Sequence, residues 1–261
     1  MARVRIAIRD LTKTFAAGTR EVPAVSHASF DVHDKEFVAI VGPSGCGKST
    51  ILNMIGSLVA PSGGEILIDG VRVGPRPGPR VGYVFQKDTV FPWRTVAQNI
   101  ALGLQYRGVA TAEIRSQVTE AVALAGLEGF EDAFPATLSG GMRQRVALMR
   151  SLVVNPEILL MDEPFGALDT HTKLNLHAEL LSLWGARQQT VVFVTHDLSE
   201  AITLADRIVV MTRRPGRVKL IYDVKLPRPR DVIRLRETAE YLREYGEIWH
   251  ALGEEFQERV S

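Results

Sequence analysis

The sequence has little of several features that would place the protein in other classes. It contains one cysteine among 261 residues, which excludes an internal disulfide and is typical of a reducing compartment. Its 31 lysines and arginines are balanced by 30 acidic residues, so the net charge of +1 gives no long-range attraction to nucleic acid. No apolar run approaches the roughly 18 residues of a membrane-spanning helix, and residues 1–6 lack the apolar stretch of a signal peptide. We therefore expect a soluble protein, whose contact with a membrane would depend on partners.

The pattern of apolar segments indicates an α/β fold. Val4, Ile6 and Ile8 alternate with arginines, as in an antiparallel strand with one face in water. Further along, short apolar runs alternate with helical segments, which is typical of a mostly parallel sheet covered by helices on both faces. The predicted strands are 37–41, 65–68, 81–85, 158–161, 191–194 and 208–211, and the predicted helices between and after them are 48–58, 139–152, 172–184 and 199–205.

A helical segment interrupts this alternation. From about Asp88 to Thr137 the apolar residues keep a helical period, with Thr111 as the expected helix cap. We predict an α/β core domain over 1–229, with a helical subdomain at about 88–155, and a short helical extension over 230–261. The proline- and glycine-rich stretch 74–79 is predicted to be a loop.

A phosphate-binding loop follows the strand 37–41. The spacing from Gly42 to Lys48 and Ser49 satisfies Gly-x4-Gly-Lys-Ser/Thr between a strand and a helix. The glycines allow backbone N–H groups to point inward, Lys48 supplies a charge for the outer phosphates, and the Ser49 hydroxyl can ligate Mg²⁺. The predicted nucleotide-binding residues here are Gly42, Pro43, Ser44, Gly45, Cys46, Gly47, Lys48, Ser49 and Thr50.

Two acidic residues end the strand 158–161. Because neighbouring side chains at a strand end point in different directions, Asp162 and Glu163 can have different roles. We expect Asp162 to hold Mg²⁺ through its water and Glu163 to orient and polarise the attacking water. Acidic residues also end strands for purely structural reasons, but the preceding phosphate loop favours the catalytic interpretation.

A second glycine-rich element opens another helix. Ser139, Gly140 and Gly141 would present free N–H groups in a first helical turn. Ser-Gly-Gly is also an ordinary cap and turn. Since the chain already has one phosphate cradle, a second one suggests a nucleotide shared with another subunit.

In this order the phosphate loop, the segment Leu138-Ser139-Gly140-Gly141-Met142 and the strand ending in Asp162-Glu163 resemble the ATP-binding subunit of an ABC transporter. The resemblance implies that two copies sandwich two ATP molecules head to tail, with Mg²⁺ at each. One position departs from the pattern, because Met142 stands where glutamine is commoner.

The resemblance assigns further residues by their place in the chain. Gln86 would sense the γ-phosphate, contact the metal and respond to the membrane partner, and His196 would contact the γ-phosphate and hold the water in place. Phe15 would stack on adenine, although tyrosine is more usual there. The segment Ala167-Leu168-Asp169 would cross the dimer interface. With these, the predicted catalytic residues are Glu163, His196, Lys48 and Gln86, and the predicted metal ligands are Ser49, Gln86 and Asp162.

Three less specific segments resemble the nitrate, sulfonate, taurine and bicarbonate importer subgroup. They are 91–96, containing Phe91-Pro92-Trp93, then 213–217 and 245–249. The resemblance implies two transmembrane permease subunits, indirectly a solute-binding protein, and a peripheral position at the cytoplasmic face of the membrane. The solute would be small and anionic. Phe91-Pro92-Trp93 could instead simply pack the helical lobe. The alternatives are an exporter or lipid-extraction ATPase, and an ATPase acting on nucleic acid or ribosomes.

Overall fold

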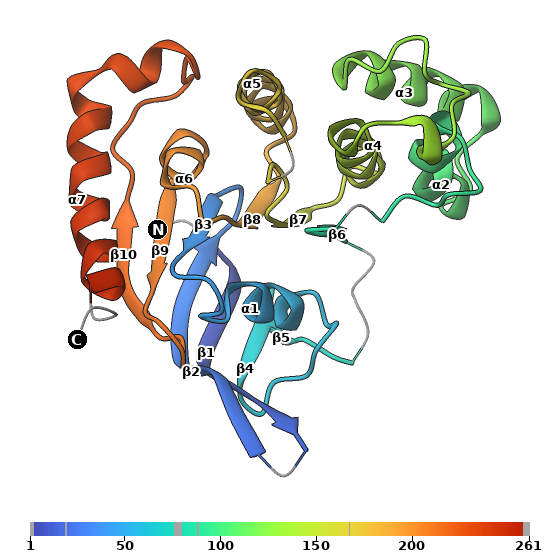
Figure 1. The fold of residues 1–261 in the computed structure, drawn as a ribbon. Coiled ribbons are helices and arrows are strands. Elements are labelled where there is room, and N and C mark those ends of the chain that lie inside the picture. Colours follow the sequence, from blue (N-terminus) through green and yellow to red (C-terminus); the bar gives the residue numbers. More distant parts are fainter. Residues whose placement is uncertain (1–2, 19, 76–79, 88, 167, 258–261) are drawn as a thin grey trace. The chain divides into compact units, whose positions relative to one another are not determined.

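The chain folds into two compact units in the structure, a computed structural model that describes residues 3–18, 20–75, 80–87, 89–166 and 168–257 (Figure 1). The first unit comprises 1–81, 158–162 and 188–261, and the second comprises 82–157 and 163–187. Each unit has its own buried core. Among the described residues, no helix combines the length and the apolar character needed to cross a membrane.

An antiparallel sheet forms one part of the first unit. Its strands run in the order β2-β1-β4-β5. The alternation at the start of β1 predicted that its arginines face water, and this is wrong for Arg5, which is buried. Its guanidinium donates to Asp69 (3.1 Å), so a paired charge replaces hydration. The bounds are β1 Val4–Ala17, β2 Arg20–His33, β4 Gly63–Ile68 and β5 Val71–Arg72.

A second, mostly parallel sheet carries the core of this unit. Within the unit its strands run in the order β10-β9-β3-β8-β7. The pairs β3–β8, β3–β9 and β7–β8 are parallel, and β10 is antiparallel to β9. Strands β3, β7 and β8 are buried at every residue, as continuous apolar runs in a sheet covered on both faces should be. The bounds are β3 Phe37–Val41, β7 Ile158–Asp162, β8 Thr190–Val194, β9 Arg207–Met211 and β10 Val218–Asp223.

Helices α1 (Lys48–Ile55), α6 (Leu198–Leu204) and α7 (Ala239–Gln257) belong to the same unit, together with the short 3₁₀ helix η2 (Arg234–Glu237). The apolar face of α7 is buried at Tyr241, Ile248 and Leu252, and α7 packs against α6 (Figure 1). The C-terminal segment is thus helical from Ala239 to Gln257, as the sequence predicts for this part of the chain. The domain limits 1–229 and 230–261 stay a prediction.

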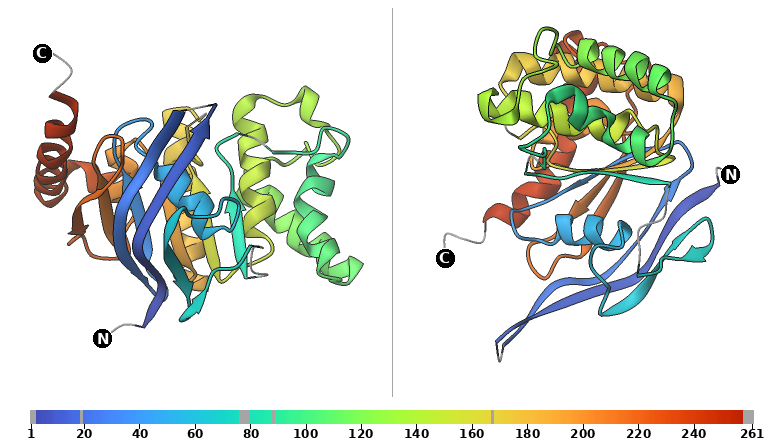
Figure 2. Two further views of the ribbon diagram at one scale, coloured as in Figure 1. Left: turned by 90° about the horizontal axis from the view of Figure 1, so that it is seen from below. Right: turned by 90° about the vertical axis from the view of Figure 1, so that its right-hand side faces the viewer.

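The second unit is mainly helical. Helix α2 packs against both α3 and α4 (Figure 2). The predicted cap of α3 is wrong: Thr111 is the first helical residue, and the cap is Ala110, which makes no side-chain cap bond. The cap of α4 is confirmed, because Ser139 Oγ accepts from the Met142 N–H (3.2 Å). The bounds are β6 Val81–Val84, α2 Val96–Tyr106, α3 Thr111–Leu124, η1 Pro135–Thr137, α4 Gly140–Leu152 and α5 Thr170–Arg187.

Two glycines of the antiparallel sheet provide a matched stability test. Gly64 and Gly70 have nearly equal positive φ angles of 74° and 75°. A Cβ at Gly64 would lie 2.3 Å from the Asp10 carbonyl oxygen, whereas a Cβ at Gly70 would meet nothing within 4 Å. We expect Gly70→Ala to lower the free energy of unfolding by about 1 kcal/mol through backbone strain, and Gly64→Ala by at least about 2 kcal/mol more. Denaturant midpoints measure both, and equal losses would contradict the close approach at Gly64.

Candidate functional site: a nucleotide-binding centre

The loop between β3 and α1 has the backbone geometry of a phosphate cradle. Gly45 and Gly47 adopt positive φ angles of 78° and 97°. Gly47 is the cap residue of α1 and has no side chain, so it does not cap the first N–H groups of the helix. A Cβ at Gly47 would lie 2.8 Å from the Ala24 carbonyl oxygen, which explains why glycine is needed there. The loop and helix start can therefore bind an anion.

Lys48 is aimed into this loop. Its side chain is buried, and its ammonium donates to the carbonyl oxygens of Gly42 (2.8 Å) and Pro43 (3.0 Å). These two carbonyls hold the ammonium charge of Lys48 within the same loop that presents the N–H groups. Lys48 is thus placed to meet phosphate oxygens.

Ser49 and Asp162 lie together, as the sequence predicts for two ligands of one metal. The Ser49 hydroxyl donates to Asp162 Oδ1 at 2.7 Å, joining the start of α1 to the end of β7. Asp162 is buried. A hydroxyl and a carboxylate oxygen are the hard donors that Mg²⁺ prefers, and Mg²⁺ usually takes few protein ligands and completes its shell with water and phosphate. This donor set fits Mg²⁺.

His196 follows β8 in a loop that is fixed from both sides. Thr195 Oγ1 donates to Glu200 Oε2 (2.6 Å) and accepts from the Asp197 N–H (3.0 Å). Asp197 in turn caps α6 by accepting from the Ser199 N–H (2.9 Å). His196 is exposed within this held loop. It also borders a pocket of about 420 Å³, lined on other sides by Val41, Gly42, Asp197, Leu198, Tyr245, Trp249 and Leu252.

Phe15 lies on β1 opposite Val22, with 39% of its surface exposed. The Lys13 ammonium lies 5.0 Å from the centre of its ring. One face of the ring therefore already contacts a cation. The role of Phe15 in adenine binding stays a prediction.

In the second unit Gln86 and Glu163 are brought together. Gln86 Nε2 donates to Glu163 Oε2 at 3.2 Å. Glu163 also has a φ of 45°, in the left-handed region that non-glycine residues seldom occupy. Strained backbone of this kind concentrates at functional positions. The position of the Glu163 carboxylate is therefore set by a strained backbone conformation and by the hydrogen bond from the Gln86 amide.

The glycine-rich start of α4 lies open to solvent. Ser139 and Gly140 are exposed and Gly141 is half-buried. Within the unit, α4 is tied to the residues after Glu163, because Gln144 Nε2 donates to the Pro164 carbonyl (3.0 Å). In the predicted interface segment, Ala167 lies outside the described residues, and Asp169 Oδ1 accepts from the Thr172 N–H (3.0 Å). Hydrogen bonds from the Thr172 side chain and, to a smaller extent, from its N–H lower the pKa of Asp169.

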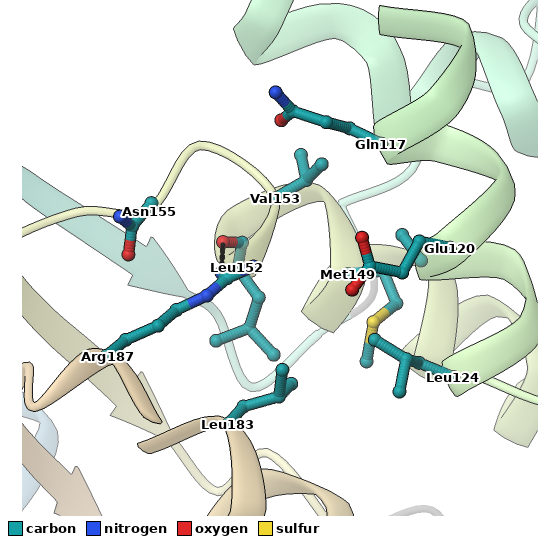
Figure 3. Close-up of a pocket in the computed structure, with 10 residues that line it drawn as sticks. Gln117, Glu120, Leu124, Met149, Leu152, Val153, Asn155, Leu183 and Arg187 are labelled. Carbon is teal, nitrogen blue, oxygen red and sulfur yellow. Dashed lines mark hydrogen bonds between the residues drawn. The ribbon is translucent and has the colours of Figure 1, made fainter. Parts of the chain in front are cut away.

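A pocket of about 290 Å³ lies at the other end of α4 (Figure 3). Apolar side chains line it from α3, α4 and α5, with Glu120 and Arg187 on different sides. Arg187 donates to the Leu152 carbonyl at 3.0 Å and so caps the end of α4. None of the predicted site residues lines this pocket, so we do not assign the nucleotide to it. Its lining residues are Gln117, Glu120, Ala121, Leu124, Met149, Leu152, Val153, Asn155, Leu183 and Arg187.

The sequence interpretation missed one residue that shapes the phosphate loop. Gly216, in the turn after β9, exchanges backbone bonds with β2: its N–H donates to Ala24 and its carbonyl accepts from Ser26, both at 2.9 Å. A Cβ at Gly216 would lie 1.9 Å from the Cys46 carbonyl oxygen. The Pro215-Gly216 pair was the available signal, since it marks a tight turn, but its contact with Cys46 could not be predicted from spacing.

The fold and these contacts define a nucleotide-binding protein with a phosphate loop at the carboxyl ends of a parallel sheet. Comparison with known families matches the ABC transporter model over residues 25–166. The chain belongs to this family.

Individual relatives agree with this assignment. The chain is 42% identical to the aliphatic sulfonates import ATP-binding protein SsuB of Bacillus cereus, over 86% of this chain and 88% of the relative. It is 46% identical to the taurine import ATP-binding protein TauB of Rhizobium johnstonii, over 80% of this chain and 79% of the relative.

A solved structure shows the same fold. It is the dimeric post-hydrolysis state of the ATP-binding cassette MJ0796 bound to ADP and Pi, with a TM-score of 0.78 and 33% identity. The match covers 85% of this chain and 100% of the cassette. The predicted ABC ATPase fold, with its mostly parallel core sheet, antiparallel sheet and helical segment, is confirmed.

The sole cysteine offers a test of the phosphate loop in solution. From its place in the loop, Cys46 would be expected to react readily with thiol reagents in nucleotide-free protein. The structure corrects this, because the side chain is buried and burial raises the pKa of the thiol above its usual value. At pH 8 we expect the native protein to react at least about tenfold more slowly than the unfolded chain, because the thiolate is the reactive form. Saturating Mg-ATP should slow it further. Equal rates for native and unfolded protein would contradict the buried position.

Proposed function

We propose that the protein is the ATP-hydrolysing subunit of an ABC importer. The observation that carries the nucleotide part is the 2.7 Å hydrogen bond between Ser49 and Asp162, which joins the phosphate loop to the acidic strand end. Membership of the ABC transporter family supports the transport part of the proposal.

Each proposed site residue has a distinct task. The loop N–H groups and Lys48 bind the phosphates and offset their charge, while Ser49 and Asp162, with Gln86, would hold Mg²⁺. When bound, Mg²⁺ neutralises charge on the phosphate oxygens. Glu163 accepts hydrogen bonds and orients the attacking water, and His196 contacts the γ-phosphate. Phe15 stacks on the adenine.

We further propose that the site is completed by a second copy of the chain. The start of α4 is exposed at Ser139 and Gly140 and half-buried at Gly141. If the phosphate loop of the same chain already binds one ATP, the N–H groups at the start of α4 are left to bind the phosphate of a second nucleotide. A head-to-tail dimer would bring these N–H groups to the partner's nucleotide. The related cassette MJ0796 is dimeric in its ADP- and Pi-bound structure.

For the transport role, we propose uptake of a small anionic solute such as a sulfonate or taurine. The names of the SsuB and TauB relatives favour import over export, lipid extraction or work on nucleic acid. Two permease subunits would hold the protein at the cytoplasmic face of the membrane, and a solute-binding protein would deliver the solute to them.

The roles of Lys48 and Glu163 can be separated by substitution. Lys48 would contact phosphate in both the ground state and the transition state, so Lys48→Ala should weaken ATP binding and abolish turnover together. Glu163→Gln keeps the shape but not the charge that orients water, so it should bind ATP normally and lose about 10²- to 10³-fold in kcat. Because ATP is bound but not hydrolysed, an ATP-loaded dimer should then accumulate, and size-exclusion chromatography with Mg-ATP would detect it. Wild-type hydrolysis by Glu163→Gln would contradict its role.

The aromatic segment after Gln86 contains one packed and one exposed ring. Phe91 is fixed by Asn99, which accepts from the Phe91 N–H (2.7 Å), and its ring lies 5.5 Å from the Arg150 guanidinium carbon. Trp93 is 69% exposed. Phe91 therefore fits the simple packing interpretation, and we propose that Trp93 is the side chain that contacts a permease subunit.

Substitution of Trp93 tests the permease contact. Trp93→Ala should weaken assembly with the permease subunits by roughly thirtyfold, since aromatic anchors typically contribute at least about 2 kcal/mol at interfaces. ATP affinity and thermal stability should stay near wild type because Trp93 is mostly exposed, with the Phe91 ring as its aromatic neighbour (5.4 Å between ring centres). Tyr106→Ala is the matched control, as Tyr106 is 85% exposed at the end of α2. Equal assembly of the two variants, measured by co-purification with the permease, would remove the proposed role of Trp93.

A further inference from the structure

Helix α6, which begins two residues after His196, ends in an unusual set of contacts. An α-helix leaves its last four carbonyl groups without partners inside the helix. Here two arginines donate to the carbonyls of four consecutive residues. Arg230 Nη1 donates to Ile202 (3.1 Å), Thr203 (3.1 Å) and Ala205 (2.8 Å), and Arg228 Nη2 donates to Leu204 (2.7 Å).

The two arginines are themselves held in place. Arg230 is buried, and its remaining donors reach the Leu226 carbonyl at 3.1 and 3.3 Å. Arg228 Nε donates to Asp206 Oδ1 (2.7 Å), and the other oxygen of Asp206 accepts from the Phe37 N–H at the start of β3 (3.0 Å). The end of α6 is thus fixed to the core sheet through two hydrogen-bonded guanidinium groups.

The charge of Arg230 survives its burial. Desolvation, with the nearby positive charge of Arg228, lowers the pKa of Arg230 to about 10. The group is therefore still a cation at neutral pH, facing the negative end of the helix dipole. Removing it would leave carbonyl groups buried without their donors, which is costlier than losing an exposed bond.

The opposite end of α6 carries the histidine loop. Asp197 caps the helix, and Glu200, in its first turn, accepts from Thr195 on the other side of His196. The helix has seven residues and spans only about 10 Å. A short helix bonded at both ends passes a displacement at one end to the other. One short helix therefore links residues 202–205 to the loop that carries His196.

We propose that Arg228 and Arg230 are positioning residues for His196, acting through α6. This rests on the proposed contact of His196 with the γ-phosphate. The C-terminal part of the chain then sets the geometry of hydrolysis without touching the nucleotide, and the phosphate loop, which binds ATP, stays unaffected.

The first test compares binding with turnover. Arg230→Met should lower kcat by about tenfold or more, as displaced catalytic groups do, while the Kd for Mg-ATP stays within about threefold of wild type. Arg228→Met removes one carbonyl bond and should lower kcat less. Arg230→Lys keeps the charge but not the fork of donors, so it should recover only part of the rate.

Arg5→Met is the matched control. Arg5 is also a buried arginine, and it donates to Asp69 (3.1 Å), which joins the start of β1 to the residue after β4 in the antiparallel sheet. It should lower the melting temperature but leave kcat near wild type when assayed well below that temperature. An equal loss of kcat in Arg5→Met and Arg230→Met would show a general effect of destabilisation and overturn the inference. If Arg230→Met fails to fold, Arg228→Met decides: an unchanged kcat with Arg228→Met overturns the inference.

The second test asks whether the arginine acts through the histidine. In a His196→Ala background, Arg230→Met should cause little further loss of kcat, because the group that it positions is gone. Two independent, multiplying losses would overturn the positioning role while leaving the role of His196 intact. A wild-type rate for His196→Ala alone would instead contradict the proposed function of that residue, so the two failures are distinguishable.

Discussion

The close approach of backbone to backbone around the phosphate loop is the constraint on which the first unit depends. Three glycines permit it, and each faces a different element. An added Cβ at Gly42 would lie 2.9 Å from the Met211 carbonyl of β9, and one at Gly47 would lie 2.8 Å from the Ala24 carbonyl of β2. At Gly216 the added Cβ would lie 1.9 Å from the Cys46 carbonyl oxygen, in the phosphate loop itself. The loop is therefore shaped by its neighbours as much as by its own sequence, which keeps its N–H groups in place before any phosphate arrives.

Much of the core could be predicted from the sequence because buried parallel strands leave an unambiguous signal. The runs at 37–41 and 158–161 are continuously apolar, and both are strands whose every residue is buried. The helix starting at Lys48 and the cap at Ser139 were also predictable, since local motifs fix them. Placing Ser49 near Asp162 required only the rule that the carboxyl ends of the parallel strands of one sheet lie at the same edge, since β3 and β7 are separated by β8 alone.

Other features depend on contacts that no local pattern records. Strand β10 is half-exposed without regular alternation, so neither a buried nor an amphipathic strand pattern marks it. The long strand β2 extends from Arg20 to His33 with irregular pairing, which obscures its period. Arg5 follows the polar half of an alternating pattern but is buried with Asp69, 64 residues away. The arginine contacts at the end of α6 are equally non-local, since they join residues about 25 positions apart.

The backbone at Glu163 has a consequence for how the protein could change. A φ of 45° costs a glutamate more than it would cost glycine or asparagine, which enter this region readily. Replacing the carboxylate with glycine would therefore relax the chain at the position that we propose for catalysis. Stability and catalysis therefore favour different residues at this position. Selection for thermal resistance alone would therefore favour replacing Glu163, at the expense of hydrolysis.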